Sequence, residues 1–394
     1  MTAEQINELL KTHKTPLYVF DLTELNDRVN FLKNSLPERV KLCYAVKANT
    51  FISKEMSKIA PWLELCSPGE YRICKNLGVP TSKFVISGVN KSEKITQEMI
   101  ENVEDMGCYT AESVNQFHIL YESAKKAKRK IPVLLRLTSG NQFGLDEADL
   151  ERIIAEYKDS EYVDICGIQF FSGTQKTSLK KLQREISYVD GFITGLKDKY
   201  SFNSKKLEFG GGFPVSYFEG ESFDEEEYLK AFSEMLESMS FQGEIVLELG
   251  RSIAASCGTY LTSVVDIKQN HSENYAIVDG GMHQIVYFGQ FMAMKHPKIK
   301  LFPEREDENK EEWNICGSLC TVNDILVKRL PLSNLQIGDV LVFTQTGAYC
   351  VTEGISLFLT RELPEVVLLG TDGKFTTVRK PVETELFNTP NNIL

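Results

Sequence analysis

Lys47 is the residue whose place in the sequence most suggests chemistry. It stands in the run L-C-Y-A-V-K-A-N, residues 42–49, where apolar and aromatic residues predict a strand that enters a core. A lysine at the end of a strand is usually a solvated terminus. An amine held partly away from water instead has a lowered pKa and can act as a nucleophile. The rest of the chain has to decide between these two interpretations.

Other strand ends carry residues suited to binding an anion. They come from the segments L-E-F-G-G-G, F-F-S-G-T and E-L-G-R, and they are Gly210, Gly211, Gly212, Gly173, Thr174 and Arg251. Glu248 stands in the last segment, three residues before Arg251. Successive glycines let backbone N–H groups approach a phosphate closely, and a threonine adds a hydroxyl. A glutamate beside an arginine is also consistent with a plain ion pair. Each segment alone is weak evidence, because glycine-rich turns occur in every fold.

The elements that must position these residues alternate along the chain. Between about residues 25 and 255, eight short β-rich runs are each followed by a turn and a helical pattern, as in a (β/α)8 TIM barrel. Reactive residues of such a barrel lie where strands end, which is where Lys47 stands. After residue 255 the chain becomes β-rich. We therefore predict a barrel up to about residue 255, followed by a separate β domain.

Composition excludes several classes of function. The chain has 394 residues and a net charge of -11, which argues against nucleic acid and anionic membranes as partners. No signal peptide or membrane-spanning run is visible. The nine cysteines show no paired spacing, which fits a reducing, cytoplasmic location. Cys316 and Cys320 have no further ligand at zinc spacing, so no metal site is expected.

Seven motifs together resemble a known family. They are Y-A-V-K-A-N, S-P-G-E, S-G-V-N-K-S, G-G-G-F, E-L-G-R, G-S-L-C-T-V-N-D and G-A-Y, and they occur in the order found in the fold-type III pyridoxal-phosphate (PLP) decarboxylases. Diaminopimelate and ornithine decarboxylases are familiar members. The resemblance spans the chain from about Pro16 to past Tyr349. It implies an alanine-racemase-like barrel over residues 24–257 and a second domain, of β-sandwich or β-barrel type, from residues 1–23 and 258–394. It also implies PLP-dependent decarboxylation of an amino acid.

The resemblance also assigns roles to residues. Lys47 would form the internal Schiff base with PLP, and Glu248 would face the pyridine nitrogen. The cofactor's phosphate would be held by the glycine-rich turns and their neighbours, which are Gly173, Thr174, Gly210, Gly211, Gly212, Arg251 and Tyr349. The segment with Cys320 and Asp324 would reach the active site of the other subunit in a head-to-tail homodimer. Cys320 would then be the acid that reprotonates the α-carbon.

Several positions depart from the family pattern. Phe171 stands where a histidine commonly stacks on the cofactor, and Glu64 stands where an aspartate is common. Cys320 is followed by Thr321 and Val322, where diaminopimelate decarboxylases carry glutamate and serine. Tyr287 occupies the position at which that subfamily has a carboxylate-binding arginine.

These departures bear on the substrate. A distal charge without a partner is costly to bury, so free diaminopimelate, ornithine and lysine are expected to be poor substrates. The far end of the substrate is expected to be neutral or carrier-bound, because R-L-T-S-G-N-Q-F-G and F-S-G-T-Q are similar to members that act on aminoacyl groups tethered to a carrier protein. The predicted substrate-binding residues are Tyr287, Thr321 and Asp324, in a wall that also includes Phe288, Gln290 and Val322.

Two other functions share parts of this pattern. An amino-acid racemase has the same barrel and lysine, but it needs a second base, normally a tyrosine, where this chain has C-T-V-N-D. A non-catalytic PLP-binding protein is normally a single barrel, and the long β-rich segment after residue 255 argues against it. Decarboxylation is therefore the first interpretation.

Overall fold

The computed structural model describes residues 1–305 and 309–390, which form two compact units. The barrel unit consists of Val29–Pro214 and Asp224–Ser252. The β unit consists of Met1–Arg28, Val215–Phe223 and the described residues from Ile253 onward. The short segment Val215–Phe223 thus belongs to the β unit, although it lies between two barrel strands in the sequence.

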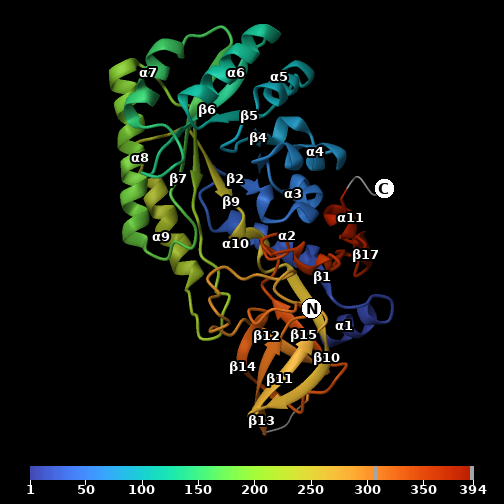
Figure 1. Ribbon diagram of the computed structural model, residues 1–394. Coiled ribbons are helices and arrows are strands. Elements are labelled where there is room, and N and C mark those ends of the chain that lie inside the picture. Colours follow the sequence, from blue (N-terminus) through green and yellow to red (C-terminus); the bar gives the residue numbers. More distant parts are fainter. Residues whose placement is uncertain (306–308, 391–394) are drawn as a thin grey trace. The chain divides into compact units, whose positions relative to one another are not determined.

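The barrel unit contains the predicted closed barrel of eight parallel strands (Figure 1). The strands are β2 (Val40–Ala45), β3 (Trp62–Leu65), β4 (Phe84–Ile86), β5 (Cys108–Ala111), β6 (Ile131–Leu137), β7 (Val163–Phe171), β8 (Lys206–Gly210) and β9 (Glu244–Leu249). All eight coincide with the apolar runs of the sequence. Pairing of β2 with β9 closes the barrel and sets Cys43 opposite Glu248.

Helices alternate with these strands. They are α2 (Leu22–Asn34), α3 (Ser53–Ile59), α4 (Pro68–Asn76), α5 (Glu93–Asn102), α6 (Val114–Ala127), α7 (Glu147–Tyr157), α8 (Leu179–Tyr200) and α9 (Glu225–Glu237). Five of them begin with a serine or aspartate whose side chain accepts a backbone N–H of the first turn, namely Ser67, Ser113, Asp146, Ser178 and Asp224. Such caps satisfy N–H groups that a helix leaves unpaired, so the sequence fixes where each helix begins.

The inside of the barrel changes from apolar to polar along its strands. An apolar cluster consists of Cys43, Val85, Cys108, Leu134, Cys166 and Val246. Residues two positions apart on a strand point to the same side. Glu248 therefore faces the interior as Val246 does, one step nearer the carboxyl end of β9. The strands thus lead from an apolar layer to a polar mouth.

The β unit is built on a nine-stranded sheet in which β1 (Leu17–Asp21) lies between β10 (Gly258–Asn270) and β16 (Glu365–Leu369). Its other strands are β11 (Glu273–Val278), β12 (Ile299–Phe302), β13 (Lys310–Cys316), β14 (Ile325–Ser333), β15 (Val340–Thr344) and β17 (Phe375–Arg379). Leu17, Val19, Leu261, Val342 and Val367 belong to its core.

Short helices complete the chain. The chain begins with α1 (Ala3–Leu10), whose Thr2 and Gln5 form a reciprocal capping box. The four-residue helices α10 (Arg251–Ala254) and α11 (Glu385–Asn388) follow later in the chain. In the described ranges, no helix combines the length and apolarity needed to cross a membrane.

Candidate active site at the mouth of the barrel

Lys47 lies in a short 3₁₀ turn, Val46–Ala48, that directly follows β2. The next residue, Asn49, is buried and its side chain accepts the backbone N–H of Phe51 at 3.0 Å. The Tyr44 hydroxyl donates to the Asn49 carbonyl at 2.9 Å. These two bonds fix the path of the chain after the strand, and they hold Lys47 at the barrel mouth.

The Lys47 ammonium points at two carboxylates of neighbouring strands. It lies 2.6 Å from Glu64 Oε2 on β3 and 3.3 Å from Glu248 Oε1 on β9, and 3.6 Å from the Cys66 sulfur. Both glutamates are buried, while the Lys47 side chain is 38% exposed. The interpretation of Lys47 as a solvated strand terminus is therefore wrong, because its charge is paired inside the barrel.

The two glutamates beside Lys47 differ in acidity. Burial alone would raise the pKa of Glu64, but the Lys47 charge and hydrogen bonds from Lys47 and Cys66 lower that pKa to about 2. Burial, together with the negative charge of Glu64, raises the pKa of Glu248 to about 7. The positive charge of Lys47 lowers this pKa, but by less than the other two raise it. Glu64 is therefore the permanent anion of the pair, and Glu248 is poised to gain or lose a proton near neutral pH.

A third buried carboxylate belongs to the same cluster and was not predicted. Glu208, on β8, is fully buried, and one Gln169 amide nitrogen lies 3.2 Å from Glu208 Oε1 and 3.2 Å from Glu248 Oε2. Burial, then the charge of Glu248, raises the pKa of Glu208 well above its ordinary value. Glu208 is thus joined to Glu248 by an amide, and burial disfavours its charged form. A lone glutamate inside the apolar run K-L-E-F-G was the available signal.

Two of the glycine-rich turns touch each other. Gly212 has φ +61°, and a Cβ there would lie 2.2 Å from the Gly173 carbonyl oxygen, so only glycine fits. Arg251, which follows β9, donates from Nε to Thr174 Oγ1 at 3.3 Å. The structure therefore brings together Gly173, Thr174, Gly212 and Arg251 from three separate strand ends.

Phe171 ends β7 beside these turns. Its ring lies so close to Gly210 that a Cβ on Gly210 would come within 2.2 Å of the ring. Gly211 is also restricted, because a Cβ there would lie 2.8 Å from the ring of Phe213. The predicted aromatic residue and the predicted glycines are thus packed on one another, and their roles toward a ligand stay predictions.

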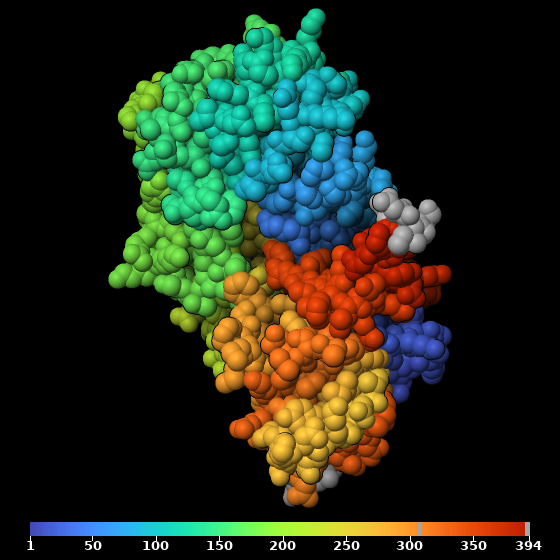
Figure 2. Space-filling model, in the orientation of Figure 1, coloured from blue at the N-terminus to red at the C-terminus, as the bar shows by residue number. Residues whose placement is uncertain are grey.

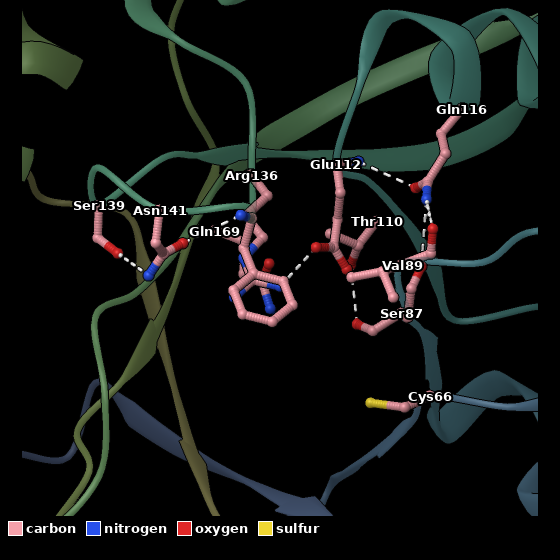
Figure 3. A network of polar contacts seen from close by, with 12 residues as sticks. Cys66, Ser87, Val89, Thr110, Glu112, Gln116, Arg136, Ser139, Asn141 and Gln169 are labelled. Carbon is pink, nitrogen blue, oxygen red and sulfur yellow. Dashed lines mark hydrogen bonds and ion pairs between the residues drawn. The ribbon is translucent and has the colours of Figure 1, made fainter.

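A polar network that the sequence analysis did not identify covers the neighbouring part of the mouth (Figure 3). Arg136 on β6 donates to Glu112 Oε2 at 2.7 Å, and both side chains are buried. The Arg136 guanidinium also lies 4.9 Å from the centre of the Phe143 ring. An arginine within the apolar run I-P-V-L-L-R-L was the signal for this pair.

The same network holds the S-G-V-N-K-S loop, residues 87–92. Gln116 accepts the backbone N–H of Glu112 at 3.1 Å and donates to the Val89 carbonyl at 2.8 Å (Figure 3). Lys91 donates to the Gly88 carbonyl at 2.8 Å. Burial lowers the pKa of Lys91 to about 8, although the Glu112 charge opposes this. An amine with a lowered pKa therefore stands in this loop.

The remaining predicted site residues lie in the β unit. Cys320 is exposed, in the loop between β13 and β14, and Val322 beside it is 88% exposed. Tyr349 is half-buried in a loop after β15 and has φ +67°. Tyr287 is buried, and its hydroxyl donates to the Thr344 carbonyl at 2.6 Å. The Tyr287 hydroxyl therefore has a partner within the β unit.

Asp324 closes the loop that carries Cys320. Its two carboxylate oxygens accept the backbone N–H groups of Met282 and Leu319, each at 2.8 Å. A Cβ at Gly317 or Gly281 would lie 2.2 or 2.6 Å from this carboxylate. Burial raises the pKa of Asp324, and the two backbone bonds oppose that rise. The predicted contact of Asp324 with substrate stays a prediction.

A pocket of about 420 Å³ opens in the β unit next to this loop. Its lining is mostly apolar, and it includes Tyr287, Gln290, Val322 and Asn323. Among the described residues that line it, Lys328 carries the only charge. The volume suits a small organic group.

Comparison with known proteins identifies the family. Residues 22–255 match the family model described as "Pyridoxal-dependent decarboxylase, pyridoxal binding domain". The chain is similar to the L-glutamyl-[BtrI acyl-carrier protein] decarboxylase of Niallia circulans, with 25% identity over 95% of this chain and 93% of that protein. It is similar to the diaminopimelate decarboxylase of Aquifex aeolicus, with 26% identity over 87% of this chain and 84% of that protein.

The fold is that of solved members as well. A crystal structure of diaminopimelate decarboxylase from Methanocaldococcus jannaschii superposes with a TM-score of 0.87, at 24% sequence identity, covering 98% of this chain and 95% of that one. The family model covers more than half of the chain and includes Lys47 and all eight barrel strands. This chain belongs to the pyridoxal-dependent decarboxylases and is a PLP-dependent amino-acid decarboxylase, a carboxy-lyase.

Proposed function

We propose that the enzyme decarboxylates an amino acid whose far end is neutral or attached to a carrier protein, in a homodimer with shared active sites. The observation that carries this proposal is the wall beside the Cys320 loop, where the one predicted carboxylate, Asp324, already accepts two backbone N–H groups instead of facing a distal ammonium. We also propose a cytoplasmic location, because all nine cysteines are free thiols, as is usual in a reducing compartment.

The residues at the barrel mouth fit PLP. A Cβ at Gly173 would meet no atom within 4 Å, so this turn has open space for a phosphate, and Gly212 lets the second turn pack directly against it. Arg251 and the Thr174 hydroxyl add a cation and a donor at the same turns. We assign phosphate binding to these residues and to Gly173, Gly210 and Gly211, with Tyr349 adding its hydroxyl. Lys47 is the amine for covalent attachment.

Acidic and aromatic groups beside Lys47 suit the ring. When bound, PLP supplies an electron sink for the charge left at the α-carbon as carbon dioxide departs. Glu248, whose pKa near 7 allows it to share a proton, would hold that proton on the pyridine nitrogen. Glu64 keeps a negative charge next to Lys47, and Phe171 offers an aromatic face for stacking.

Cys320 is the proposed proton donor to the α-carbon. Its thiol is exposed, as a group that acts on another subunit must be. Thr321, Asp324 and Tyr287 would then shape the substrate side of the site.

The pocket in the β unit supports a substrate without a distal ammonium. Thr321 and Val322 supply no charge, and Tyr287 already donates its hydroxyl to a backbone carbonyl. Lys328 cannot neutralise an ammonium. Burying an unpaired ammonium there would cost a few kcal/mol, or about a hundredfold in kcat/KM. The relative from Niallia circulans, named for a carrier-bound glutamyl group, agrees with this choice.

The test is kcat/KM for four substrates: free diaminopimelate, ornithine, lysine and a glutamyl thioester. We expect the thioester to be preferred by about a hundredfold or more, because its far end carries no charge to bury. Efficient decarboxylation of free diaminopimelate by the unmodified enzyme would show that the proposed wall is wrong.

A matched pair of variants sharpens this test. Thr321→Glu adds a carboxylate beside Cys320, whereas Thr321→Gln adds the same bulk without charge. Only the glutamate variant is expected to gain activity on free diaminopimelate relative to the thioester. Equal effects of the two variants would assign selectivity to size rather than to charge.

A further inference from the structure

Lys176 is a buried lysine behind the glycine-rich turns, and neither the sequence motifs nor the proposed mechanism uses it. It follows the Gly173–Thr174 turn and is only 7% exposed. Its ammonium donates to Glu185 Oε2 at 2.8 Å and to the Gly210 carbonyl at 3.3 Å. Its backbone N–H donates to the Gly212 carbonyl at 2.9 Å. One residue therefore bonds to both ends of the triple-glycine turn.

The partners of Lys176 are themselves held by other elements. Glu185, on α8, also accepts the Ser172 hydroxyl at 2.7 Å. The Tyr228 hydroxyl, on α9, donates to the Lys176 carbonyl at 2.8 Å. The Lys176 ammonium lies 5.4 Å from the centre of the Phe209 ring. The ends of β7 and β8 and the two following helices thus meet at this lysine.

Stability alone does not explain the buried Lys176–Glu185 ion pair. Burial lowers the pKa of Lys176, and Glu185 only partly offsets this effect. The surroundings therefore disfavour the positive charge of Lys176. Replacing a buried ion pair with apolar residues of similar volume is often neutral or stabilising. Directed hydrogen bonds provide what an apolar chain cannot, which is a fixed distance between the Gly210 carbonyl and α8.

We propose that Lys176 is a positioning residue that fixes the spacing of the Gly173–Thr174 turn and the Gly210–Gly212 turn, and thereby sets the affinity for the phosphate of PLP. The inference rests on the proposed placement of that phosphate at these turns. Lys176 acts through the backbone of the turns, because its ammonium already has Glu185 and Gly210 as partners. Replacing Lys176 should therefore weaken binding of the phosphate group and leave binding of the pyridine ring unchanged.

The experiment compares PLP with pyridoxal, which has the same ring without the phosphate. Binding of each to the cofactor-free protein is titrated by absorbance for the unmodified chain and for Lys176→Met. We expect the dissociation constant of PLP to rise by about 10- to 100-fold, the usual loss when an outer supporting partner is removed. Pyridoxal binding should change much less. A merely structural role would weaken both ligands together and leave the ratio of the two constants unchanged.

Two further variants test whether the effect of Lys176→Met is specific or comes from misfolding. Glu185→Gln keeps the shape of the partner but removes its charge, and it should change the ratio in the same direction. Lys206→Met removes a different paired lysine, which lies at the start of β8, whereas Gly210 ends that strand. The Lys206 ammonium lies 3.3 Å from Glu244 Oε1. Lys206→Met should leave the ratio unchanged.

Arg251→Met separates the two proposals. If the phosphate lies at these turns, Arg251→Met must also lower the preference for PLP over pyridoxal. If Arg251→Met lowers it while Lys176→Met and Glu185→Gln do not, Lys176 has no positioning role. If Arg251→Met leaves it unchanged as well, the phosphate lies elsewhere and both proposals fall.

Discussion

Glu64 and Glu248 both pair with Lys47 at the barrel mouth, whereas Glu208 bonds to the Gln169 amide, and this difference in partners separates their pKa values. Lys47 compensates the charge of Glu64, whose pKa is about 2. Glu208 has only an amide donor, Gln169, and burial raises its pKa well above the ordinary value. Glu248 lies between these extremes, with a pKa of about 7. The cluster can therefore keep a proton at the site until a cofactor takes it up.

Replacing Glu248 with glutamine tests this balance in the cofactor-free protein. Because the folded-state pKa, about 7, lies above the ordinary value of 4.5, the folded state binds the extra proton between these pH values. Unmodified protein should therefore lose stability as pH rises through this window, and Glu248→Gln should not suffer this loss. At about 1.4 kcal/mol per pKa unit, the difference approaches about 3 kcal/mol at neutral pH.

The measurement is urea unfolding of both proteins at several pH values. Asp164→Asn serves as the control, because that side chain is 41% exposed and pairs with Lys205 away from the cluster. A difference between Glu248→Gln and unmodified protein that stays constant with pH would contradict the prediction.

Residues at strand ends were predictable, whereas those inside strands were not. Lys47, Glu248 and Gly212 stand where an apolar run stops, and in a barrel such positions meet at one mouth. Glu208 and Gln169 stand within strands, and only the register between β7, β8 and β9 brings them to Glu248. The partners of Lys176 were equally hidden in the sequence, because Glu185 lies on α8 and the Gly210 carbonyl at the end of β8. Sequence alone gives no register between strands.

At the scale of elements, Asp324 explains how a loop can present Cys320. Two backbone N–H groups, one of the partly buried Met282 and one of the buried Leu319, depend on its carboxylate. Gly281 and Gly317 leave the space that the carboxylate fills. The loop between β13 and β14 is thereby tied to the turn after β11.

Removing the Asp324 carboxylate should loosen this loop. Asp324→Ala leaves two donors unpaired, one buried and one partly buried, and we expect a loss of about 2 to 4 kcal/mol in the free energy of unfolding together with a fall in kcat. Asp324→Asn retains one acceptor and should lose less. Asp372→Asn, in an exposed hairpin, is the control. A loss in Asp324→Ala no larger than in the control would contradict the prediction, which urea unfolding and steady-state kinetics both check.

The two units differed in how far their elements could be predicted. The eight barrel strands alternate with helical patterns along the chain, and this alternation identified them. The sheet of the β unit has no such period. Its strand β1 pairs with β10 and β16, which lie more than 200 residues away, and no local pattern indicates such partners. The N-terminal segment could be assigned to the second domain only through the family resemblance.

At the scale of the whole molecule, exposed apolar side chains are concentrated on the β unit. Of the large apolar side chains that are exposed in the described part of the chain, all but Ile73, Val89 and Tyr188 belong to it. They include Phe291 and Val322, at 74% and 88% exposed, and a group at residues 355–359, within the orange-red surface of Figure 2. Apolar surface of this extent is typical of a protein interface. It agrees with the proposal that the active unit is a homodimer.

Mixed dimers give the decisive test of shared sites. Lys47→Ala and Cys320→Ala should each be nearly inactive alone. In a mixed dimer of these two chains, Lys47 of one chain would meet Cys320 of the other at one of the two sites. Differently tagged chains allow the mixed dimer to be isolated. Its activity should then be about half that of the unmodified dimer, because one site in two is intact.

The reciprocal pairing predicts the opposite outcome. In a mixed dimer of one unmodified chain and one chain carrying both Lys47→Ala and Cys320→Ala, every shared site lacks one of the two groups, so activity should be nearly absent. If each chain instead carried its own complete site, this dimer would keep about half of its activity and the first mixed dimer would have none. The two preparations contain the same numbers of each residue. Only the geometry of sharing distinguishes them, so a reversed result would rule out Cys320 as a donor to the other subunit.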